Sequence, residues 1–116
     1  MGKPAAKKGD QIVGVDQHTM PGPPPQPLTF PFLGDLSGGL SNNVNIQKSP
    51  AATKGSTAFT KVSHPNASNL GTINEGSQTV FINHIAAARD GDSATTCDEL
   101  GRPGKVKATG AVLIGD

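Results

Sequence analysis

The sequence predicts a single, mainly β domain of short strands and hairpins, joined by long loops rich in proline and glycine. Fifteen glycines and ten prolines among 116 residues favour turns over helices. No window keeps an apolar residue at helical spacing over three turns, whereas short runs typical of strands recur. The length suits one domain, residues 1–116, with no room for a second core.

Three short stretches of the chain resemble one another, at residues 3–10, 49–56 and 85–92. Each reads x-(Pro/Ala)-Ala-Ala-x-(Lys/Asp)-Gly-(Asp/Ser). Strand-like runs at 44–47 and 79–83 precede the second and third stretches, and a similar run at 111–116 closes the sequence. The repeating unit is predicted to be a strand, an alanine step and a glycine turn, because alanine permits close backbone approach and glycine tolerates positive φ.

Two further hairpins are predicted, at 71–80 with its turn at 75–77, and at 105–114 with its turn near 109–110. Residues 20–43 are expected to form a Pro/Gly-rich loop insertion. Its prolines lack the N–H groups of a central strand, so 20–31 should run as a stiff, polyproline-like stretch along the domain wall. Leu28, Phe30, Phe32 and Leu33 would then point into a thin core. The alternative is a ligand for a proline-binding module.

A thin core needs a further source of stability, and one cysteine cannot form an internal disulfide, so a metal or a partner subunit is expected. The candidate ligands are His18, His64, His84 and Cys97. Imidazole and thiolate are common zinc ligands, and zinc binds four of them tetrahedrally. Their wide spacing requires the fold to bring them together; the alternative is that they are solvated loop residues.

The surroundings of two candidate ligands favour metal binding. His84 follows the strand-like run 79–83, and Cys97 lies in a polar loop, where a merely structural thiol is not expected. Asp16 and Asp98 lie close to candidate ligands in sequence and are candidates for orienting a histidine.

Catalysis is not expected. Cys97 with a histidine base would be the competing chemistry, but no nucleophile elbow or phosphate loop is present. The carboxylate pairs Asp90/Asp92 and Asp98/Glu99 fall in predicted turns. A free-standing metal-binding or thiol-dependent enzyme domain remains the alternative function.

Other partner classes find little support in the sequence. A small basic cluster at 3–8, a net charge of +1 and four phenylalanines do not suit nucleic-acid binding. No apolar run is long enough for a membrane span, so no stable membrane anchor is expected. The amino-terminal residues do not resemble a signal peptide.

The three repeats, with 16–21 (DQHTMP) and 43–52 (NVNIQKSPAA), resemble PAAR-repeat and PAAR-like spike-tip proteins across 1–116. The resemblance implies a small cone with one structural zinc near its vertex, held by three histidines and a cysteine, here His18, His64, His84 and Cys97. No repeat is a full Pro-Ala-Ala-Arg, since Lys7 and Thr53 replace arginine and Ala86 replaces proline.

The same resemblance implies a function and a location. It points to a structural cap on a trimeric VgrG-like spike of a type VI secretion system or related contractile injection machine. Such a cap sharpens the spike for membrane puncture and docks effector cargo non-covalently. The protein would be cytoplasmic when assembled at the tip of the apparatus, and would leave the cell on firing.

Overall fold

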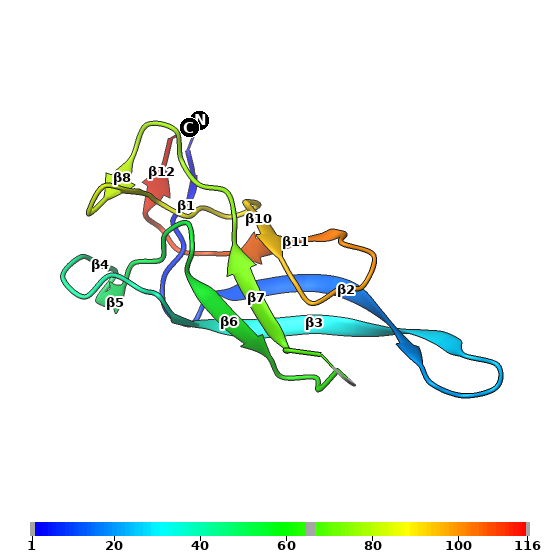
Figure 1. The fold of residues 1–116 in the computed structure, drawn as a ribbon. Coiled ribbons are helices and arrows are strands. Elements are labelled where there is room, and N and C mark those ends of the chain that lie inside the picture. The colour runs from blue at the N-terminus through cyan, green and yellow to red at the C-terminus, as the bar shows by residue number, and fades with distance from the viewer. Residues whose placement is uncertain (1, 65–66, 116) are drawn as a thin grey trace.

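The computed structural model describes residues 2–64 and 67–115, and the regular elements among them are all β-strands. Six strands close into an antiparallel barrel in the order β10-β11-β2-β3-β6-β7, and three two-stranded ladders lie beside it (Figure 1). This confirms the mainly β prediction. The described residues include no helix that could cross a membrane.

The barrel strands are β2 (Gln11–Met20), β3 (Gln26–Gly38), β6 (Thr57–Thr60), β7 (Leu70–Ile73), β10 (Ser93–Thr95) and β11 (Pro103–Lys107). The three ladders pair β1 (Lys3–Pro4) with β12 (Leu113–Ile114), β4 (Asn45–Ile46) with β5 (Ser49–Pro50), and β8 (Phe81–Ile82) with β9 (Ile85–Ala86). We call the end of the molecule formed by these ladders the base.

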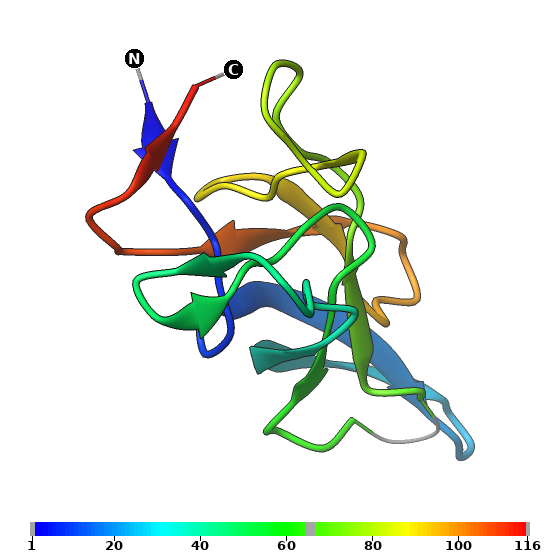
Figure 2. The same ribbon diagram turned by 90° about the vertical axis from the view of Figure 1, so that its left-hand side faces the viewer.

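The fold has approximate three-fold symmetry that follows the sequence repeat. Each unit consists of a base ladder, an alanine step and a barrel hairpin, and the hairpins β2–β3, β6–β7 and β10–β11 follow one another around the barrel. The unit that contains hairpin β2–β3 takes its base ladder from both ends of the chain, because β12 pairs with β1 (Figure 2).

A closed ring of backbone hydrogen bonds joins the three alanine steps. The N–H of Ala6 donates to the carbonyl of Ala88 (2.9 Å), that of Ala88 to Ala52 (3.1 Å), and that of Ala52 to Ala6 (3.0 Å). All three alanines have no exposed surface, so a larger side chain would meet packed atoms. The glycine that follows each step has a positive φ, 91° at Gly9 and 97° at Gly55, which confirms the predicted turns.

The core repeats the same symmetry in two small clusters. Within the barrel, equivalent positions hold Ile12, Ala58 and Ala94, and then Leu36, Ile73 and Val106, with Phe32 added from β3. Within the base, Ile46, Ile82 and Ile114 pack on Ala5, Ala51 and Ala87. Nine of the 17 buried residues in the two clusters are alanines, so the apolar core is thin, as expected from the composition.

The two predicted hairpins at 71–80 and 105–114 are wrong. Strand β7 pairs with β6 of its own unit and with β10 of the next, and β11 pairs with β10 of its own unit and with β2 of another, so neither strand pairs with the residues that follow it. Residues 75–77 and 109–110 do lie outside the strands, as predicted, but they connect a barrel strand to a strand of the base.

The proline segment is also not a loop, because its residues 26–38 form β3. Strand β2 pairs with β3 from Gln26 to Asp35, whereas β6 pairs with it only from Gly34 onward. Pro27 and Pro31 therefore lie where β3 has a free edge, and proline is tolerated there. The predicted inward residue Phe32 is 1% exposed, but Leu28 is 43% exposed. The β2–β3 hairpin projects beyond the barrel and makes the molecule elongated, 50 × 24 × 22 Å (Figure 1).

Candidate metal centre

Four potential ligands gather at the barrel end remote from the base: Asp16, His18, His64 and Cys97. One donor atom from each lies within 4.8 Å of all the others. Asp16 and His18 lie on β2, His64 on the β6–β7 connection, and Cys97 on the β10–β11 connection. Each of the three barrel hairpins therefore supplies at least one ligand.

Five of the six separations between these donor atoms are 3.0–3.5 Å, close to those of ligands on one ion, and the sixth, between Asp16 and His18, is bounded only at 4.8 Å. His18 Nε2 lies 3.0 Å from His64 Nδ1 and 3.5 Å from Cys97 Sγ, and His64 Nδ1 lies 3.1 Å from Sγ. Asp16 Oδ2 lies 3.4 Å from both His64 Nδ1 and Cys97 Sγ. Metal–ligand bonds of zinc length, arranged tetrahedrally, place neighbouring ligand atoms about 3.3–3.6 Å apart.

His64 is oriented for metal binding by a backbone carbonyl. Its side chain is fully buried, and Nε2 lies 2.9 Å from the carbonyl oxygen of Pro31, to which it can only donate. That carbonyl is available because β3 has a free edge there. Nδ1 is then left with a lone pair directed at the other donors, which is how histidine ligands are commonly held.

Asp16 is a buried carboxylate that faces other electron-rich groups. It is 1% exposed; Oδ1 accepts a hydrogen bond from Thr96 Oγ1 (2.6 Å), and Oδ2 faces His64 and Cys97. Burial, and after it the hydrogen bond to Asp16, raises the pKa of the Cys97 thiol to about 11. A bound cation would offset both effects, because it favours the thiolate and the carboxylate.

The raised pKa also bears on the alternative of a thiol-dependent enzyme. A nucleophilic cysteine needs a lowered pKa, supplied by a cationic neighbour or a base. In the absence of a metal, burial and the neighbouring Asp16 carboxylate raise the pKa of Cys97 instead.

His84 is not part of this group. It is exposed in the two-residue turn between β8 and β9, at the base, with φ 70°. Lys48 occupies the equivalent turn position between β4 and β5, also with φ 70°. The structure thus brings together three of the four expected ligands, and Asp16 lies where a fourth would be needed. The assignment of His18, His64 and Cys97 to zinc stays a prediction until metal is measured.

Sequence reasoning treated Asp16 only as an orienting partner. A signal for a more direct role was present, because residues two apart on a strand share a face, which puts Asp16 beside His18. Asp98, the other expected orienting residue, forms its side-chain hydrogen bonds with Gln17 and Arg102 rather than with a histidine. It accepts from the backbone N–H of Gln17 and from Arg102, whose guanidinium holds the pKa of Asp98 well below its usual range.

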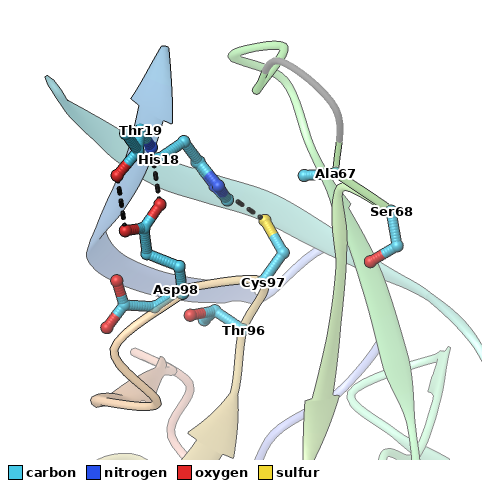
Figure 3. Close-up of a pocket in the computed structure, with 8 residues that line it drawn as sticks. His18, Thr19, Ala67, Ser68, Thr96, Cys97 and Asp98 are labelled. Atoms are coloured by element: carbon cyan, nitrogen blue, oxygen red, sulfur yellow. Dashed lines mark hydrogen bonds between the residues drawn. The ribbon is translucent and has the colours of Figure 1, made fainter. Parts of the chain in front are cut away.

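A polar pocket of about 410 Å³ opens beside the ligands, with His18 and Cys97 in its wall. Figure 3 shows the imidazole of His18 and the sulfur of Cys97 directed at each other from β2 and from the loop after β10. The pocket gives the ligand group a route to solvent, which a metal site needs for loading.

The fold and the site define a three-fold β-barrel whose hairpin ends converge on one group of potential metal ligands. The model of the PAAR motif family matches residues 34–98, which include the second and third repeats, His64 and Cys97. The chain therefore belongs to the PAAR motif family, as the repeats indicated. No curated protein and no solved structure matches it. Family membership supports a spike-tip role related to type VI secretion, and a structural family fits the expectation of no catalysis.

Proposed function

We propose that this protein is a non-catalytic cap on a trimeric, VgrG-like spike protein of a contractile injection system. The observation that carries the proposal is the closed ring of backbone hydrogen bonds between Ala6, Ala52 and Ala88. The ring places three equivalent ladders around one axis at the base. A single chain built in this way can present a similar surface to each subunit of a three-fold partner.

The base also carries exposed apolar side chains suited to burial against a partner. Phe81 is 57% exposed, Leu113 61% and Ile85 46%. In the remaining unit, the position equivalent to Phe81 and Leu113 holds Asn45. Large apolar groups gathered at one end of a small domain are typical of an interaction surface.

We further propose that His18, His64, Cys97 and Asp16 hold one structural zinc ion. Thiolate and imidazole are preferred zinc ligands, and four protein ligands make a closed, structural type of site. When bound, the ion supplies cross-links between the ends of the three barrel hairpins, where apolar packing is sparse. Its binding free energy then becomes folding free energy.

Docking is tested by co-expressing the chain with the trimeric spike protein and measuring the stoichiometry by native mass spectrometry. One chain per trimer is expected. Phe81→Glu and Leu113→Glu should each weaken binding at least about 30-fold, equivalent to about 2 kcal/mol. Phe59→Glu is the matched control, since Phe59 is 61% exposed but lies on β6, away from the base. Equal binding by all three variants would exclude the base as the docking surface.

The metal is tested by elemental analysis of the purified protein. We expect one zinc per chain, lost in Cys97→Ser, reduced in Asp16→Asn and retained in His84→Ala. When free zinc is kept at about 100 times the Kd of the site, chelating it should lower the free energy of unfolding by roughly 2.7 kcal/mol. Zinc retained in Cys97→Ser, or lost in His84→Ala, would contradict the proposed ligand set.

A further inference from the structure

We infer that Asp98 and Glu99 are positioning residues that clamp the Cys97 loop to β2 and set the separation of Cys97 from His18 before metal binds. The inference rests on the proposed metal site. The clamp joins residues 96, 98 and 99 to residues 16, 17 and 19, so that it encloses both ligands.

The clamp takes the place of a missing strand. Strand β11 pairs with β2 only from Gln11 to Val13, so the same edge of β2 lacks a neighbouring strand further along. There the N–H of Gln17 donates to Asp98 Oδ1 (2.6 Å), and the N–H of Thr19 donates to Glu99 Oε1 (2.5 Å). Hydrogen bonds from N–H groups to carboxylates are among the stronger ones in proteins. The two carboxylates thereby fix the backbone on both sides of His18.

Each carboxylate is itself held in place. The side chain of Asp98 is 1% exposed and accepts from the backbone N–H and from Nε of Arg102, both at 2.9 Å. Glu99 Oε2 accepts from Thr19 Oγ1 at 2.7 Å, and the Glu99 N–H donates to the carbonyl of Gln17 at 3.2 Å. The loop therefore has little freedom to move along β2.

A third attachment involves a ligand directly. Thr96 Oγ1 donates to Asp16 Oδ1 at 2.6 Å, which leaves Oδ2 facing the other donors. Since residues 96 and 98 flank Cys97, and 17 and 19 flank His18, the attachments hold Sγ and Nε2 at 3.5 Å. Ligands fixed in this way lose little conformational freedom on binding, which favours tight metal binding.

The test uses Co²⁺ as the probe, because its visible spectrum reports coordination geometry and the bond to sulfur. Asp98→Ala and Glu99→Ala should weaken Co²⁺ affinity about 10–100-fold and shift the thiolate-to-cobalt band. Asp98→Asn and Glu99→Gln should keep part of the Co²⁺ affinity and show a smaller shift of the band, since each keeps one acceptor oxygen.

The matched control is Asp10→Ala. Asp10 accepts from the N–H of Lys7 at 3.1 Å and pairs with its Nζ at 3.2 Å, next to the alanine ring and away from the ligands. This variant should lose stability without any change in Co²⁺ affinity or spectrum, which separates positioning from a general structural effect.

The outcomes distinguish the clamp from the metal site. If the parent protein binds no Co²⁺, the metal centre and the clamp both fail. If the parent binds Co²⁺ and the alanine variants match it in affinity and spectrum, the clamp is overturned and the metal centre stands. Circular dichroism checks folding; should Asp98→Ala not fold, the exposed Glu99 provides the decisive variant.

Discussion

Three side chains at equivalent positions of the repeat, two charged and one neutral, allow the energetic cost of losing a charged group to be compared within one protein. Asp10, Ser56 and Asp92 each follow a glycine turn and accept a hydrogen bond from the backbone N–H three residues earlier, at 3.1, 2.9 and 2.6 Å. They differ in charge and in partner. We predict that replacing each by alanine destabilises the protein in graded steps, with Asp92 far the most costly.

The magnitudes follow from what each substitution leaves behind. Asp92 pairs with Arg89 at 2.7 Å, and the two side chains are 1% and 7% exposed, so Asp92→Ala removes a buried carboxylate from a buried guanidinium, which keeps a hydrogen bond to the carbonyl of Gly76. Breaking such a pair costs about 3–5 kcal/mol. Lys7 beside Asp10 is 17% exposed and keeps contact with water, so Asp10→Ala should cost about 1.5–3 kcal/mol. Ser56→Ala removes only neutral bonds, for about 1–2 kcal/mol.

The measurement is urea unfolding of the three variants with saturating zinc, so that metal affinity does not enter the comparison. Equal slopes of the free energy of unfolding against urea would show that the variants unfold the same structure. If Ser56→Ala proves as costly as Asp92→Ala, charge burial does not distinguish the three positions and the reasoning is refuted.

Two further predictions concern the chain ends and the thiol. Ile114 pairs with Lys3 as Ile46 pairs with Ser49 and Ile82 with Ile85, and two-residue turns join the latter two pairs. A permutant in which two residues link Ile114 to Lys3 and whose chain opens between Gln47 and Lys48 should therefore fold and bind zinc; a protein without β-type circular dichroism would show that the units are not interchangeable. In chelated protein near neutral pH, Cys97 should react with iodoacetamide more slowly than glutathione does, because its pKa of about 11 keeps the thiol protonated; faster reaction would favour the thiol-dependent enzyme.

The sequence by itself determined the features that depend on local conformation or on rare residue types. The glycines after each alanine step require positive φ, so the turns at Gly9, Gly55 and Gly91 were predictable. Base strands β4, β8 and β12 followed from short strand-like runs of the sequence, whereas their partners β1, β5 and β9 did not. His18, His64 and Cys97 could be chosen because the chain has so few residues that bind zinc well.

The tertiary structure alone decided which strands pair and which donors meet. Strands β7 and β11 each pair with the preceding strand of their own unit and with a strand of a neighbouring unit, because closing the barrel satisfies both edges of each strand. A free edge on β3 made room for Pro27 and Pro31 within a strand. His84 lies in a turn of the base, and Asp16 lies among the potential metal ligands. Neither position could be read from the residues that neighbour them in the sequence. Ligand convergence depends on contacts between residues up to 81 positions apart, and local sequence carries no record of such contacts.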